Sequence, residues 1–245
     1  MKVLLTGGSG MVGKAIKSWL VHHDCPVVSL VRRPVKDDVT EIFWDPLKKE
    51  IDSSQLVGFD VVIHLAGENV ASGLWTQKKK KKILGSRVKS TECLVDEILK
   101  MKDKPKLFIS ASGINIYGRN GVEDPPFTED SPENGTDYLS EVVRQWEGAT
   151  EPLKSSGIRV CHLRLGAVLS PTGGLLKKVL PIFKFAAGGR LGSGKQMMPW
   201  VDLQDVVSAI WHCINTEELS SQEKINEIKS ELFENLPFYD NLLYN

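Results

Sequence analysis

The feature that most constrains the fold is a glycine-rich segment near the N-terminus. A short apolar strand leads directly into Gly7, Gly10 and Gly13, and apolar residues then recur at helical spacing over residues 12–20. Glycine permits a sharp turn and a close approach of the backbone to a pyrophosphate, and the next helix offers free N–H groups. The order strand, glycine turn, helix predicts a nucleotide-binding unit; the alternative is an ordinary tight turn.

The second predicted strand, residues 26–31, ends in Arg32 and Arg33. In a nucleotide-binding unit this strand end meets the adenosine ribose, where an acidic residue binds the 2′-hydroxyl of NAD. Arginine instead suits the 2′-phosphate of NADP, because the guanidinium makes charge-assisted hydrogen bonds to phosphate. Two arginines without an acid favour NADP(H), and the alternative is a solvated basic turn.

Strands and helices alternate along the rest of the chain. We expect an α/β fold with a Rossmann-type, doubly wound parallel sheet of six or seven strands and helices on both faces. Residues 1–170 are predicted to form an NADP-binding domain, and residues 171–245 a small C-terminal substrate or lid region. In an alternative arrangement, the strand and helix at about 200–214 pack back onto the first domain. Further strands are expected at residues 41–44, 60–65, 106–110 and 159–165, and helices at 82–100, 138–153 and 175–185.

Composition excludes several classes of function. Lys and Arg total 31 and Asp and Glu total 31, a balance that argues against nucleic acid or anionic membranes as main partners. The four cysteines are scattered without metal-ligand spacing, which predicts reduced thiols in a cytoplasmic protein and no metal site. No apolar run is long enough for a membrane span, and the strand at the N-terminus argues against a signal peptide.

Two features of the sequence can be interpreted either as functional or as purely structural. His64 ends an apolar run, and we interpret it as a packed core histidine rather than a catalytic base. The five lysines at residues 78–82 could form an anion or membrane patch, but a solvated first turn of a helix is the favoured interpretation.

Five motifs carry a resemblance to a known family. They are Thr6–Gly13 (TGGSGMVG), His64–Asn69 (HLAGEN), Ile83–Arg87 (ILGSR), Arg164–Leu169 (RLGAVL) and, most specific, Gly188–Val201 (GGRLGSGKQMMPWV). Over roughly residues 1–219 the chain resembles the extended short-chain dehydrogenase/reductases, in particular the NAD(P)-dependent epimerase-like branch that includes the human family 39U protein. Similarity fades after Leu219, so the substrate-side lid is expected to be shortened or different.

The resemblance implies the residues that contact NADP(H) and substrate. For the cofactor these are Gly7, Ser9, Gly10, Met11, Val12, Gly13, Arg32, Arg33, Leu65, Ala66, Gly67, Lys82, Arg87 and Leu165. For the substrate we expect Glu68, Asn69, Gln196 and Trp200.

The catalytic motif of this superfamily is incomplete. Short-chain dehydrogenases usually carry Tyr-x-x-x-Lys, in which the lysine lowers the tyrosine pKa, but here Tyr138 is followed four residues later by Val142. Glu141 is expected to raise that pKa by like-charge repulsion. The usual serine or threonine position holds glycine, and Ser112 lies one residue early. The candidate catalytic residues are therefore Ser112, Tyr117 and Tyr138.

These observations give two hypotheses for function. The first is an NADP(H)-binding, epimerase-like oxidoreductase that acts on an unknown small carbonyl or sugar-like substrate. The alternative is a non-catalytic NADPH-binding protein that serves as a redox-responsive scaffold or regulator. The apolar stripes of the helices at 82–100 and 138–153 also suggest a homodimer.

Overall fold

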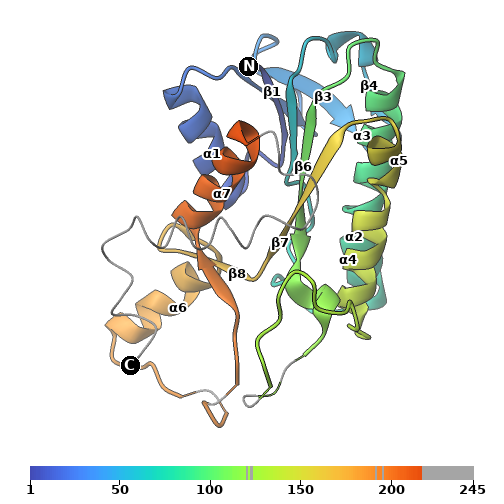
Figure 1. Cartoon of the computed structure of the whole chain (residues 1–245). Helices are drawn as coiled ribbons and strands as arrows, with labels where there is room; N and C mark the ends of the chain where they lie inside the picture. Colours follow the sequence, from blue (N-terminus) through green and yellow to red (C-terminus); the bar gives the residue numbers. More distant parts are fainter. Residues whose placement is uncertain (120, 122–123, 191, 195, 217–245) are drawn as a thin grey trace.

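The computed structural model describes every residue except 120, 122–123, 191, 195 and 217–245. Its centre is a seven-stranded sheet in the order β4-β3-β2-β1-β5-β6-β7, in which only β4 is antiparallel to its neighbour (Figure 1). The predicted doubly wound sheet is therefore confirmed. The strands are β1 (Val3–Thr6), β2 (Val27–Val31), β3 (Glu41–Asp45), β4 (Glu50–Ile51), β5 (Val61–His64), β6 (Leu107–Gly113) and β7 (Arg159–Leu165).

Helices cover both faces of the sheet because successive strand residues point to opposite sides. Val3 and Leu5 pack with α1 (Met11–His22) and α7 (Leu203–Asn215), whereas Leu4 lies in the core shared with α3 (Val88–Lys100). Figure 1 shows α2, α3, α4 and α5 together on the other face from α1 and α7. The remaining bounds on that face are α2 (Gln77–Gly85), α4 (Tyr138–Gly148) and α5 (Glu151–Ser155).

Each long helix predicted on that face is broken in two. The first break falls at Ser86 and Arg87, where the Ser86 hydroxyl donates to the carbonyl of Ile83. The second falls at Ala149 and Thr150, and Pro152 then occupies the first turn of α5, where its missing N–H costs nothing.

The C-terminal region has a small sheet of its own. Strand β8 (Ala167–Ser170) pairs with β9 (Trp200–Asp202), and α6 (Gly174–Lys184) lies between them in the chain. Helix α7 returns to the main sheet, where Val206 and Ile210 join the core around α1. Of the segment at about 200–214, the helix packs on the first domain and the strand does not join its sheet. The division at residue 170 stays a prediction, and the tail after Leu219 lies outside the described residues.

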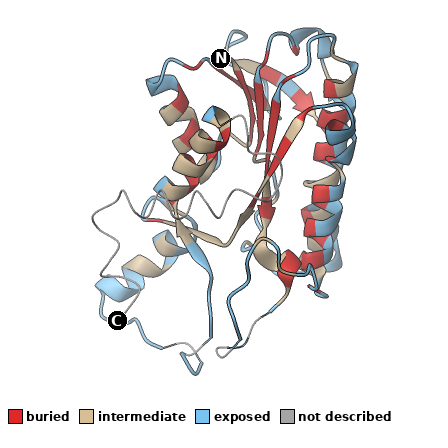
Figure 2. Cartoon of the chain, viewed as in Figure 1, coloured by how far each residue is buried: buried red, intermediate tan, exposed pale blue. Residues whose placement is uncertain are grey.

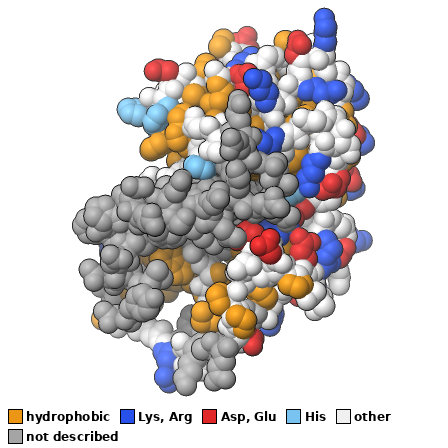
Figure 3. Space-filling model, viewed as in Figure 1, with side chains coloured by type: hydrophobic (Ala, Val, Ile, Leu, Met, Phe, Trp, Pro, Cys, Tyr) orange, Lys and Arg blue, Asp and Glu red, His pale blue; other side chains and the backbone are white. Residues whose placement is uncertain are grey.

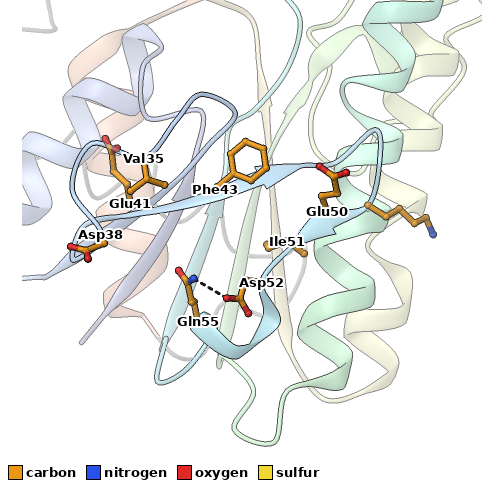
Figure 4. A pocket seen from close by; sticks show the side chains of 9 residues that line it. Val35, Asp38, Glu41, Phe43, Glu50, Ile51, Asp52 and Gln55 are labelled. Carbon is orange, nitrogen blue, oxygen red and sulfur yellow. Dashed lines mark hydrogen bonds between the residues drawn. The ribbon is translucent and has the colours of Figure 1, made fainter.

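The connection from β2 to β3 contains no helix, which leaves the outer face of β3 open. Ile42 and Trp44 point into the core, whereas Phe43 on the other face is exposed. Val35 and Ile51 flank Phe43 in a shallow hollow that carboxylates surround (Figure 4). This hollow lies at the β3–β4 edge of the sheet and not at the glycine turn. Within the part of the chain that the structure describes, every helix is too short or too polar to span a bilayer.

Candidate nucleotide-binding and catalytic site

The glycine turn lies where the connections of the sheet diverge. Strand β1 sits between β2 and β5, and the chain leaves the carboxyl ends of these strands toward opposite sides. In open α/β sheets ligands bind at this point. Gly7 follows β1 with a φ of +72°, and a Cβ there would lie 2.7 Å from the carbonyl carbon of Leu65. A Cβ on Gly13 would lie 2.2 Å from the carbonyl oxygen of Gly7, so the turn forms a cradle that only glycine permits.

The start of α1 suits an anion. Gly10 is the N-cap, no side chain caps the helix, and its first turn contains no acidic residue. The N–H groups of that turn therefore have no competing carboxylate, and the helix end favours negative charge. Ser9, Met11 and Val12 surround this point; Ser9 is exposed and the other two are half-buried.

A buried hydrogen-bond chain holds the end of β5 against β1. The Thr6 hydroxyl accepts the N–H groups of Leu65 and Ala66 at 3.1 and 3.2 Å, so its single proton is donated to Nδ1 of His64, 2.7 Å away. Nε2 of His64 then carries the ring proton and donates to the Ser90 hydroxyl at 3.3 Å. Burial lowers the pKa of His64 to about 3, with the nearby Arg87 contributing. His64 is a neutral core residue, as the sequence pattern indicates.

The two arginines after β2 differ in their surroundings. The Arg33 guanidinium is held by Glu41, with Nη1 at 2.9 Å from one carboxylate oxygen and Nη2 at 2.5 Å from the other. This hydrogen bonding lowers the pKa of Glu41 to about 2. Arg32 is exposed, and no ion pair involves it among the described residues. The acidic partner of Arg33 is a residue that the sequence pattern did not indicate.

The lysine-rich helix α2 is tied to the loop after β5. Nζ of Lys79 and Nζ of Lys82 lie 2.7 and 3.0 Å from the two carboxylate oxygens of Glu68. These hydrogen bonds lower the pKa of Glu68, and the bond from Lys79 has the larger effect. Arg87 donates to the Glu68 carbonyl at 3.0 Å and packs over Gly67 and Trp146. Lys78, Lys81 and Lys82 are exposed, as a solvated helix predicts.

A second buried cluster joins β6, α4 and β7. Arg164 binds the carboxylate of Glu147 at both oxygens, at 2.9 and 2.7 Å, and Nη1 donates to the Tyr117 hydroxyl at 2.7 Å. Ser112 donates its proton to Glu147, and Arg164 also pairs with Glu133. Ser112 and Tyr117, predicted separately, therefore belong to one network.

Burial and pairing act in opposite directions in this cluster. Burial raises the pKa of Glu147, but hydrogen bonds from Arg164 and Ser112, with His162 nearby, outweigh it and leave the pKa lowered. Burial would lower the pKa of Arg164, yet its bonds to Glu147 and Tyr117 raise it. The pair is thus fully ionised at neutral pH. The Tyr117 ring also stacks on Phe127, with centroids 5.6 Å apart.

Tyr138 lies at the start of α4, next to the lysine-rich helix α2 and away from the cluster around Glu147. Its hydroxyl donates to the carbonyl of Lys80 at 2.5 Å. Its pKa is raised, but burial is the cause rather than Glu141, whose carboxylate is bonded to Arg144 and Gln145. The direction expected from the sequence is right and the reason is corrected.

The expected substrate residues fall in two places. Glu68 is committed to the lysines, and Oδ1 of Asn69 accepts the N–H of Ala71 at 2.8 Å. Gln196 and Trp200 are exposed in the segment that leads to β9. Leu165 ends β7 and packs against the main core. Among the described residues no group of three or more His, Cys, Asp or Glu side chains could hold a metal ion.

The sheet order, the glycine cradle and the uncapped start of α1 together define a nucleotide-binding protein of the Rossmann type. The chain belongs to the NAD dependent epimerase/dehydratase family, whose model matches residues 3–226. It is 34% identical over 220 residues to the epimerase family protein ML0860 of Mycobacterium leprae, covering 89% of this chain and 69% of the relative.

Solved structures agree with this assignment. The human epimerase family protein SDR39U1, crystallised with NADPH, superposes with a TM-score of 0.80 at 30% identity, covering 90% of this chain and 72% of that chain. MoeE5 in complex with UDP-glucose and NAD superposes with a TM-score of 0.72 at 21% identity, covering 90% and 74%, and shows the fold alone.

Proposed function

We propose that this chain binds NADP(H) at the glycine turn and acts as an epimerase-like oxidoreductase on a small carbonyl or sugar-like substrate. The observation that carries the proposal is the cradle itself, in which Gly7 and Gly13 leave no room for a Cβ beside an acid-free helix start. NADPH in the human relative supports the choice of cofactor. Bound NADPH would supply a hydride; the residues of the chain bind it, orient it and move the proton.

Arg32 supports NADP(H) over NAD(H), because its guanidinium is exposed whereas that of Arg33 is already bonded to Glu41. Arg32→Ala should weaken NADPH binding about 10- to 100-fold, the value of a charge-assisted hydrogen bond, and leave NADH binding unchanged. Arg33→Ala is the matched control and should have the smaller effect. Calorimetric titration of both cofactors measures the ratio, and an equal loss for NADH and NADPH would argue against the assignment.

Tyr117 is the best candidate for the proton donor. A hydroxyl has one proton, and those of Ser112 and Tyr138 are donated to Glu147 and to the Lys80 carbonyl. The Tyr117 oxygen instead accepts from Arg164, so its own O–H has no acceptor among the described residues. Arg164 also fixes the direction in which that O–H is presented.

Turnover tests this role. NADPH oxidation is followed against a panel of small carbonyls, including nucleotide sugars, and Tyr117→Phe should lower turnover by about 100-fold, the usual contribution of general acid catalysis. Tyr138→Phe is the matched control and should stay within a few-fold. If Tyr138→Phe alone abolishes turnover while NADPH affinity is intact, Tyr138 is the donor and Tyr117 is not.

A non-catalytic NADPH-binding scaffold is the second candidate function. It is favoured by the committed protons of Ser112 and Tyr138 and by the buried Val142 at the place of the usual lysine. Tight NADPH binding with no oxidation by any carbonyl in the panel would favour this function over the first.

Oligomeric state and location in the cell remain predictions. On α3 and α4 no large apolar side chain is exposed among the described residues. Figure 3 shows lysine, arginine, aspartate and glutamate side chains interspersed on the side of the molecule that these helices form. A homodimer through α3 and α4 would therefore be held by polar contacts. Light scattering at two salt concentrations tests it.

A further inference from the structure

Helix α6 and the segment after it form an exposed apolar surface. None of the residues of α6 is buried, and residues 181–190 are all exposed (Figure 2). The side chain of Phe185 is 84% exposed. Exposed apolar surface of this kind marks an interaction site rather than a normal surface. We call this surface the α6 face; its large apolar members are Leu175, Ile182, Phe183 and Phe185.

The α6 face is also positively charged. Residues 171–201 contain no acidic residue. The four described cations, Lys177, Lys178, Lys184 and Arg190, are exposed, and none of them makes an ion pair within the described part of the chain. An occupant of this face must therefore bring both apolar side chains and negative charge.

Residues 217–245 have this chemistry. They begin immediately after α7, and they contain seven acidic residues against two lysines. Their large apolar side chains are Leu219, Ile225, Ile228, Leu232, Phe233, Leu236, Phe238, Tyr239, Leu242, Leu243 and Tyr244. At about 3.3 Å per residue, a segment of this length can reach any part of the α6 face.

Similar proteins are longer than this chain, which covers only 69% of the Mycobacterium leprae protein and 72% of the human structure. The family model matches this chain up to residue 226, and residues 227–245 contain four acidic residues and one lysine.

We propose that residues 217–245 of this chain dock on the α6 face within the same molecule. Apolar side chains of the segment cover Phe183, Phe185 and their neighbours, and its carboxylates neutralise the lysines of α6. Docking buries apolar area that is otherwise in contact with water, which stabilises the C-terminal region.

Zero-length coupling of carboxylates to lysines with a carbodiimide tests the docking in the full chain. Mass spectrometry should find coupled peptides that join Lys177, Lys178 or Lys184 to acidic residues of 217–245. A mixture of isotopically light and heavy chains separates coupling within a chain from coupling between chains. Coupling only between chains assigns the face to a second copy, and no coupling at all removes the proposal.

Hydrogen exchange of a matched pair of variants gives an independent readout. Phe185→Asp should raise exchange of the amides in residues 217–245 about tenfold or more, because the segment loses its apolar contact. Leu74→Asp changes an equally exposed side chain, at 85%, on a different surface and should leave that exchange unchanged. Phe185 makes few contacts of its own, so the variant should still fold.

Three exchange results would overturn the proposal. The first is full exchange of residues 217–245 in the unmodified protein, and the second is equal behaviour of the two variants. The third is protection of residues 175–190 that appears only when a nucleoside diphosphate sugar is added, which would assign the α6 face to substrate. Because none of these readouts requires NADPH, failure here is distinguishable from failure of the proposed cofactor.

Discussion

The edge of the sheet at the carboxyl ends of its strands has two halves that present different groups. We call them the backbone half, around β1, β2 and β5, and the side-chain half, around β6 and β7. Around β1, β2 and β5 the surface is made of backbone: a glycine turn, an uncapped helix start and two N–H groups fixed by Thr6. Around β6 and β7 it is made of side chains that bond to one another, with Glu147 and Arg164 at the centre. In the first half the N–H groups at the start of α1 have no side-chain cap, whereas the second half has already used most of its donors.

This difference separates binding from chemistry. A backbone cradle depends on the absence of side chains, so it recognises a pyrophosphate whatever the substrate is. A side-chain network depends on each partner, so a single replacement redistributes its protons and charges. On the proposed function, the first half binds the cofactor and the second half contains the candidate groups for the reaction.

The largest expected effect comes from adding one carbon to the backbone half. Gly13→Ala places a Cβ against the Gly7 carbonyl, so the turn must open. We expect NADPH affinity to fall at least about 100-fold and the free energy of unfolding to fall by about 1–3 kcal/mol. Gly148→Ala is the control, because nothing lies within 4 Å of its added carbon and alanine favours a helix. Denaturant unfolding and NADPH titration measure both; unchanged affinity in Gly13→Ala would remove the cradle argument.

Loss of the Glu147 charge should destabilise the side-chain half. Glu147→Gln leaves Arg164 buried with a weaker partner, which should lower the free energy of unfolding by about 3 kcal/mol. Glu141→Gln, an exposed carboxylate paired with Arg144, is the control and should show no measurable change.

The pH dependence of the same variant sharpens the test. Because the pKa of Glu147 is lowered in the folded protein, its stabilisation is present above the unfolded value of about 4.3 and is lost as the pH falls through the folded pKa. The difference between the wild type and Glu147→Gln should therefore shrink below about pH 4. A difference that is independent of pH would mean that Glu147 is not ionised.

The most gradual effect, spread over several pH units, concerns the junction between β1 and β5. His64 has a pKa of about 3 when folded and about 6.5 when unfolded, so the unfolded chain alone takes up a proton between these values. The free energy of unfolding should fall as the pH drops from 6.5, by up to about 1.4 kcal/mol per pH unit from this residue. His64→Gln should remove that part of the slope in urea titrations, leaving a contribution from His162, whose pKa burial also lowers. An unchanged slope would place His64 in contact with water.

The sequence predicts the backbone half well and the side-chain half poorly. Glycine spacing and apolar periodicity are local signals, so β1, α1 and the doubly wound parallel sheet follow from them. The partners Glu147 and Arg164 are 17 residues apart in sequence and meet only because β7 pairs beside β6. A signal does exist, since Arg164 is a charged residue near the end of β7, but nothing local names its partner.

The sequence pattern also does not predict which hydroxyl group donates its proton in a hydrogen bond and which one accepts. Ser112 and Tyr117 are both hydroxyls near one strand end, and the residues alone do not distinguish donor from acceptor. The distinction comes from neighbours on other elements, Glu147 from α4 and Arg164 from β7. The sequence pattern does not indicate the breaks at Ser86 and Ala149 for a related reason, because the apolar stripes continue through them.

The two-residue strand β4 has a consequence for aggregation. An open sheet edge is a template on which another chain can add a strand, and proteins resist this with short, charged edge strands. At the β4 end, the antiparallel strand holds only Glu50 and Ile51, and Lys48 and Lys49 precede it. Strand β4 itself therefore offers another chain too few backbone groups for fibril-like stacking.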